Sequence, residues 1–171
     1  MGPNMWMIPI VALIPMVIGA VWYNPKVMGS AWMAETGMTE EKAQQSNMVM
    51  VFGCAYLFAM MIALGIFPVV VHQWGAWALF VAEPDFEKAG SETMVAVDAI
   101  VDIIGNKHMT FKHGALHGGL AGFFISLPLI GTNALFEQKS WKYIWINVGY
   151  WTISLMLMGG CLSQWGFNSG V

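Results

Sequence analysis

Two pairs of side chains with metal-binding chemistry stand close together in the segment DAIVD…KHGALH. Asp98 and Asp102 are four residues apart, and so are His113 and His117. Residues at this spacing lie on one face of an α-helix, so each pair can point at a common position. Two imidazoles can share a transition-metal ion, and carboxylates can complete its shell. The pattern indicates a candidate site for a divalent metal, and no other cofactor is expected.

The same residues also have a structural explanation. The aspartates fit the solvated face of an amphipathic helix, and His113 falls at the edge of an apolar segment. His117 comes one turn deeper, where its imidazole can hydrogen-bond to a neighbouring helix. His72 and His108 are further candidate ligands. The glutamate of the HExxH motif is missing, so nothing here predicts a zinc hydrolase.

The composition places these residues in a membrane protein. Of the 171 residues, 57% are hydrophobic and 10% are charged, against about 25% charged in ordinary globular domains. The mean hydropathy is +0.61. All seven cations are lysines, and the net charge is −3. Because no basic patch is present, binding to nucleic acid is excluded.

Long stretches without charge mark four predicted spans. Each is long enough to cross a bilayer as a helix, which takes about 20 residues. Helices are required because lipid offers no hydrogen-bond partner to the backbone. No basic residue precedes the first stretch, which is therefore predicted to be a retained helix rather than a cleaved signal peptide. The spans of this single all-α membrane domain (1–171) are residues 4–23, 48–71, 113–136 and 141–165.

Residues 72–112 form the predicted extramembrane or interfacial connection. Within it, SETMVAVDAIVDIIGNK has the pattern of a short amphipathic helix, with Ser91 as its N-cap and Gly105 as its stop. In the earlier polar segment, Thr39 is a predicted N-cap. In the third span, Pro128 is expected to interrupt the helix, because proline removes a backbone donor.

Glycine and polar residues indicate how the spans pack. Gly114, Gly118 and Gly122 recur every four residues and predict the close approach of another helix, from the same chain or from another. The last span carries a polar stripe, which should face the bundle because polar groups are costly in lipid. Its members are Asn147, Tyr150, Ser154 and Cys161.

Residues suited to the membrane–water interface lie near the ends of the first and last spans. They are Trp6, Trp22, Tyr23, Lys26, Trp141, Trp145 and Trp165. Four spans would place both termini on one side with the long connection. The short loops of the other side hold four of the seven lysines, which predicts that the termini lie outside.

Several motifs together resemble a bacterial four-helix membrane family known only as a domain of unknown function. They are WYNP…GSAWM after the first span, HG at the start of the third, and TNALFEQKSWKYIWINVGYW leading into the fourth. The resemblance covers residues 11–45 and 113–165, whereas the 83–112 connection is longer than the family's pattern. It implies the four-helix fold and a bacterial inner membrane location, and it implies no activity.

The sequence contains no phosphate-binding loop, nucleophile elbow or CxxC motif. The predicted function is therefore non-enzymatic: association in the lipid bilayer, as a homo-oligomer or as an accessory subunit of a larger membrane complex. The alternative is a small transporter or channel that handles a metal ion or protons through His113 and His117.

Overall fold

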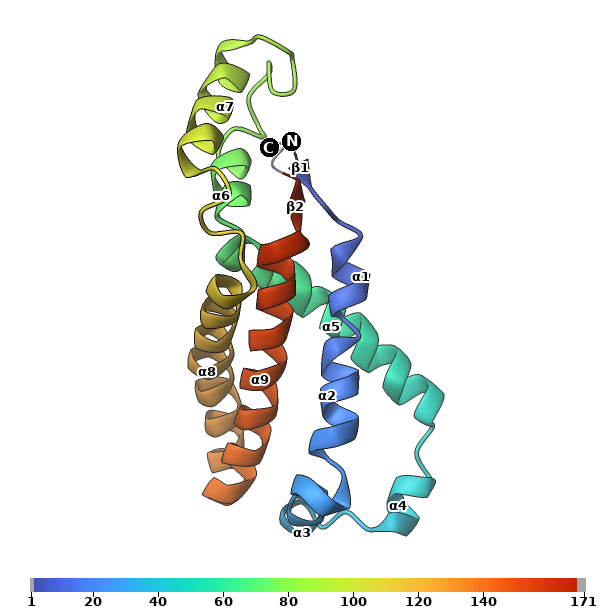
Figure 1. Cartoon of the computed structure of the whole chain (residues 1–171). Coiled ribbons are helices and arrows are strands. Elements are labelled where there is room, and N and C mark those ends of the chain that lie inside the picture. Colours follow the sequence, from blue (N-terminus) through green and yellow to red (C-terminus); the bar gives the residue numbers. More distant parts are fainter. Residues whose placement is uncertain (1, 169–171) are drawn as a thin grey trace.

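In the computed structural model, which describes residues 2–168, the chain is almost entirely helical (Figure 1). The predicted all-α class is confirmed over these residues, apart from two strands of two residues each. In chain order the elements are β1 (Gly2–Pro3), α1 (Met7–Val11), α2 (Ile14–Trp22), the π-helix η1 (Pro25–Gly29), α3 (Ser30–Thr36), α4 (Glu40–Gln44), α5 (Met48–Val70), α6 (His72–Ala78), α7 (Glu92–Ile104), α8 (Phe111–Phe136), α9 (Trp141–Trp165) and β2 (Phe167–Asn168).

Within residues 2–168, three helices, α5, α8 and α9, are long and apolar enough to cross a membrane. Each begins and ends within two residues of a predicted span. The first predicted span, 4–23, is not one helix but is divided into α1 and α2. A fourth crossing is reached only if Met7–Trp22 and Pro25–Thr36, bent by 56°, form one span. Pro15 explains the division, because it stands at the start of α2 and has no N–H to donate to the preceding turn.

Helices α8 and α9 form an antiparallel hairpin, and the contact between them is the most extensive among the described elements. A Cβ on Gly118 would lie 2.1 Å from the carbonyl oxygen of Leu155, and one on Gly114 would lie 2.2 Å from that of Gly159. Gly122 also faces the α9 backbone. The two backbones approach more closely than larger residues would allow, so the predicted glycine face is used within the chain.

Helix α2 lies against α9, and the polar stripe of α9 faces this contact. The indole N–H of Trp22 donates to a main-chain carbonyl of α9 at 3.0 Å, and the Tyr23 hydroxyl donates to Oδ1 of Asn147 at 3.0 Å. The Tyr150 hydroxyl donates to a carbonyl of α2, and Ser154 is fully buried. Trp22 and Tyr23 are thus half-buried helix contacts, whereas the other residues proposed for the interface are exposed: Trp6, Lys26, Trp141, Trp145 and Trp165.

The chain leaves α2 through the single π-turn η1. Asn24 is extended, and its side chain accepts the N–H of Lys26. The N–H of Gly29 donates to the carbonyl of Asn24, five residues earlier, at 2.9 Å. A Cβ on Gly29 would lie 2.1 Å from the carbonyl oxygen of Tyr23, so a side chain does not fit there. Helix α3 follows directly and sets the Trp32 ring edge-on to Tyr23, with 5.5 Å between the centroids.

Prolines do not end the two long helices that contain them. The predicted interruption at Pro128 is wrong, because α8 continues through this residue. The hydroxyl of Ser126 donates to the carbonyl of Gly122, so this polar group is satisfied inside the helix. Pro68 likewise lies within α5, which ends only at Val70.

Both described ends of the chain lie at the same end of the molecule as α7 (Figure 1), where β1 and β2 pair as antiparallel strands. Helix α7 begins after Ser91, whose hydroxyl accepts the N–H of Met94, and it ends at Gly105, which has a φ of +53°. Helix α4 begins after Thr39, whose hydroxyl accepts a backbone N–H. These three predicted helix boundaries are confirmed.

Candidate metal site

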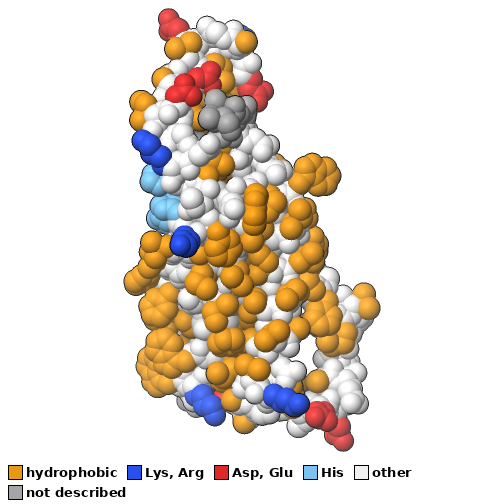
Figure 2. Space-filling model, in the orientation of Figure 1, with side chains coloured by type: hydrophobic (Ala, Val, Ile, Leu, Met, Phe, Trp, Pro, Cys, Tyr) orange, Lys and Arg blue, Asp and Glu red, His pale blue; other side chains and the backbone are white. Residues whose placement is uncertain are grey.

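All four histidines of the chain come together at one place. The ring centroid of His72 lies within 5.3 Å of the centroids of the other three: His108, His113 and His117. Figure 2 shows histidine side chains where the apolar body of the molecule meets its charged upper end. The cluster therefore lies at the N-terminal end of α8, next to the connection between α5 and α8.

Two local features of the chain position these histidines. Helix α8 begins after Thr110, whose hydroxyl accepts the N–H of His113 at 3.3 Å, and His117 follows one turn later, as predicted. Val71 is extended, with φ −113° and ψ 93°, and this ends α5. The resulting change of direction makes His72 the first residue of α6 and brings it against the first turns of α8.

Three of the imidazoles have the geometry of a metal-binding group. One ring nitrogen each from His72, His113 and His117 lies within 4.8 Å of the others. The Nε2 atoms of His72 and His113 are 2.8 Å apart. In a tetrahedral zinc site with Zn–N bonds of about 2.0–2.1 Å, two ligand nitrogens lie about 3.3 Å apart. To hold a first-row transition-metal ion, the His72–His113 pair would have to open by about 0.5 Å, and any pair near the 4.8 Å limit would have to close.

The electrostatic setting keeps His72 in the form that binds metal. Burial lowers the pKa of His72 below its ordinary value, and the neighbouring His117 and His108 lower it further. Burial disfavours the imidazolium form, and so does a second positive charge nearby. A metal ligand must be the neutral imidazole, so His72 is ready to ligate at neutral pH.

The structure does not bring the predicted aspartates to this group. Asp98 and Asp102 are exposed on α7, and within the described residues the metal-binding group contains histidines alone. His72 takes the place given to the carboxylates. It lies 41 positions before His113, so no sequence spacing connects the two, and only the packing of α6 near α8 does.

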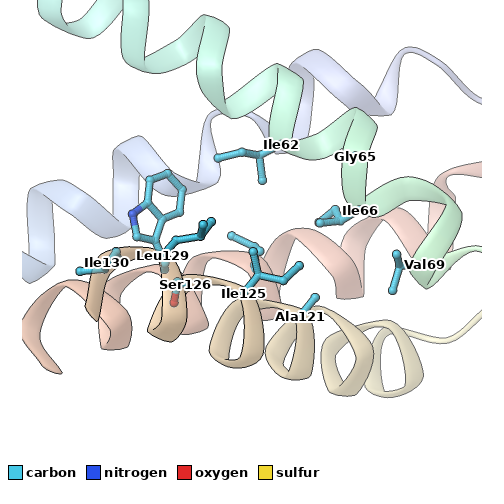
Figure 3. Close-up of a pocket in the computed structure, with 11 residues that line it drawn as sticks. Ile62, Gly65, Ile66, Val69, Ala121, Ile125, Ser126, Leu129 and Ile130 are labelled. Carbon is cyan, nitrogen blue, oxygen red and sulfur yellow. The ribbon is translucent and has the colours of Figure 1, made fainter. Parts of the chain in front are cut away.

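A second concave feature lies along the long helices and is lined almost entirely by apolar side chains. It is a groove of about 380 Å³ between α5 and the α8–α9 hairpin, and Figure 3 shows Ile62 and Ile66 of α5 facing Ile125 of α8 across it. The hydroxyl of Ser126 lies in its wall and is already bonded to a main-chain carbonyl. The indole of Trp151 also lines the groove. The groove can therefore receive hydrocarbon, and it offers few groups that would hold a polar substrate.

Comparison with known proteins gives a family without an assigned activity. No match was found among curated proteins or among solved structures. The family model described as "Protein of unknown function (DUF1761)" matches residues 6–163, which is most of the chain. This agrees with the family resemblance seen in the sequence motifs. The chain belongs to the DUF1761 family of proteins of unknown function, and its own structure contains helices long and apolar enough to cross a membrane.

Proposed function

We propose that this protein is a non-enzymatic integral membrane protein that binds a divalent transition-metal ion through His72, His113 and His117. The observation that carries the proposal is the convergence of their three ligand nitrogens within 4.8 Å. Imidazole suits zinc, copper, iron and nickel, and it is a poor ligand for magnesium or calcium. The site lies where an apolar span meets water, so it serves the capture of an ion at the membrane surface or its delivery there.

A titration of purified, metal-stripped protein with Zn²⁺ tests this function. We expect about one ion per chain, as in other histidine-based zinc sites. The variant carrying both His113→Ala and His117→Ala should lose this binding. The variant carrying Asp98→Asn and Asp102→Asn is the matched control and should bind normally, because the two aspartates lie outside the histidine group. Wild-type protein that binds no zinc, copper, iron or nickel would remove the proposal.

The histidine site also supports the alternative function, a small metal transporter. A measurement of Zn²⁺ flux across a membrane distinguishes transport from binding alone. In sealed vesicles containing the protein, a carrier should move Zn²⁺ inward at a rate that the double histidine variant abolishes. A protein that only binds should show stoichiometric uptake without flux. The described interior favours binding, since no charged side chain of the described residues is buried along the spans.

A second function, association with other membrane subunits, is favoured by the position of α5. The first half of this helix stands away from the α8–α9 hairpin (Figure 1), and its side chains are largely exposed: 85% for Val49 and 60% for Phe58. We propose that this face and the adjoining groove contact a second copy or a larger complex, in a bacterial inner membrane. Native mass spectrometry after extraction in mild detergent tests this, and a lone monomer would count against it.

A further inference from the structure

The loop between α7 and α8, residues 105–110, is fastened by buried polar side chains. The described chain buries three polar side chains almost completely, namely Gln73, Ser154 and Ser163. Two of them hold this loop. Nε2 of Gln73 donates to the carbonyl of Gly105 at 2.7 Å, and the hydroxyl of Ser163 donates to the carbonyl of His108 at 2.8 Å.

Burying a polar side chain is unfavourable unless it makes hydrogen bonds. Gln73 and Ser163 are each 1% exposed, and both direct their donors at the backbone of one short loop. Thr110, at the end of the same loop, caps α8. The backbone around His108 is therefore held from α6, from α9 and from the start of α8.

The side chain of His108 is exposed, in contrast to its anchored backbone. Its ring centroid lies 4.7 Å from that of His113 and 5.3 Å from that of His72. Rotation of an exposed side chain is fast, so the imidazole can turn a nitrogen toward the other three histidines without any movement of the backbone.

We propose, resting on the metal-binding function above, that His108 is a fourth ligand and completes a four-imidazole shell. Gln73 and Ser163 are positioning residues that hold the loop for it. Three histidines leave one coordination position open, as in catalytic zinc sites, whereas four close the shell. The ion is thus retained when His108 is bound and is exchangeable when His108 turns away. This assigns the site to ion retention and exchange rather than to metal-assisted hydrolysis.

The test measures Zn²⁺ affinity of the purified full-length chain by competition with a chromophoric chelator. It compares wild type with His108→Ala, Ser163→Ala and the double variant. Lys107→Gln is the matched control, since it changes an exposed side chain of the same loop. Ser163→Ala removes only the hydroxyl that donates to the His108 carbonyl, and it changes the side chain of no proposed ligand. Co²⁺ absorption spectra of the same variants report whether the set of ligands changes.

We expect His108→Ala to weaken binding by about 10- to 100-fold, and Ser163→Ala to weaken it by no more than His108→Ala does, because Ser163 acts through that ligand. The double variant should bind no more weakly than His108→Ala, because both changes remove the same interaction. Lys107→Gln should bind like wild type. The Co²⁺ absorption spectrum of His108→Ala should differ from that of wild type, because water replaces one imidazole in the shell.

Three results would overturn all or part of the proposal, and they are distinguishable. Equal affinity and unchanged Co²⁺ spectra in wild type and His108→Ala would leave a three-histidine site, so the metal-binding function would stand without a fourth ligand. Absence of metal binding in the wild type would remove both the metal-binding function and the proposed fourth ligand. Strictly additive losses for Ser163→Ala and His108→Ala would show that Ser163 does not act through His108.

Discussion

Gly118 of α8 and Leu155 of α9 meet backbone to backbone: a Cβ added to Gly118 would lie 2.1 Å from the Leu155 carbonyl oxygen. Since the obstacle is main chain rather than a flexible side chain, the hairpin has to open to accept even one methyl group. This contact is therefore the most sensitive point at which to test how the two spans pack.

Gly118→Ala is expected to destabilise the protein by about 1–3 kcal/mol, the usual range for overpacking. Thermal unfolding in detergent, followed by circular dichroism, measures the loss. Gly53→Ala is the matched control in α5, where a Cβ would meet nothing within 4 Å. It should be neutral or stabilising by up to about 1 kcal/mol, because alanine favours helix over glycine. Equal destabilisation by both substitutions would contradict the packing of α8 on α9.

The hydrogen bond from Tyr23 to Asn147 should contribute measurably to the docking of α2 on α9. Tyr23→Phe removes the hydroxyl and is expected to cost about 1 kcal/mol, the usual net value of one hydrogen bond. A double-mutant cycle with Asn147→Leu should show coupling of about 0.5 kcal/mol or more. Tyr143→Phe is a suitable control, since Asn147 uses the main-chain carbonyl of that residue. Strict additivity in the cycle would show that the two side chains do not interact in the membrane.

Water accessibility should change sharply over the end of α2. Lys26 is exposed beyond the end of α2, whereas Gly19 faces α9, where a Cβ added to it would lie 3.5 Å from the ring of Tyr150. In single-cysteine variants without Cys54 and Cys161, we expect rapid labelling of Lys26→Cys by a membrane-impermeant maleimide. Gly19→Cys should stay unlabelled until detergent unfolds the chain. The reverse order would move the boundary of the first membrane segment.

Removal of bound metal should lower thermal stability without unfolding the helices. The histidine cluster lies at the end of the hairpin. The close approach of α8 and α9 is made by glycines and does not use the histidine side chains. A ligand present at 100 times its Kd stabilises the folded state by about 2.7 kcal/mol. Treatment with a chelator should therefore reduce Tm. The helical circular dichroism signal should be retained at about 20 °C, which is well below ordinary melting points. A collapse of that signal would show that the metal holds the fold itself.

The long helices could be predicted because their determinants are local. Helix α9 matches a long run without charge that begins after Lys142, and the caps Ser91 and Thr39 set the starts of α7 and α4. The break at Ala12 and Leu13 was harder to predict, because proline ends some helices and is tolerated in others. Pro15 divides the first segment, whereas Pro128 lies inside α8, and only the surrounding packing separates the two cases.

At the candidate site, too, local spacing could be predicted from the sequence and long-range packing could not. His113 and His117 could be paired from their spacing, because both belong to one helix. Asp98 and Asp102 follow the same rule and yet lie on α7 outside the cluster. His72 joins through a turn at Val71, and such long-range convergence leaves no periodic signal in a single sequence.

The π-turn η1 has a further consequence for the WYNPKVMG segment. A π-turn contains one residue more than an α-turn, and each residue in an α-helix advances the side-chain direction by about 100°. The extra residue therefore rotates α3 as a unit and sets the direction from which Trp32 reaches Tyr23. Deleting one residue between Pro25 and Gly29 would leave the composition of this signature almost unchanged while turning Trp32 to a different side. The segment thus fixes the rotation of α3 about its axis, and the number of residues in it matters as much as their types.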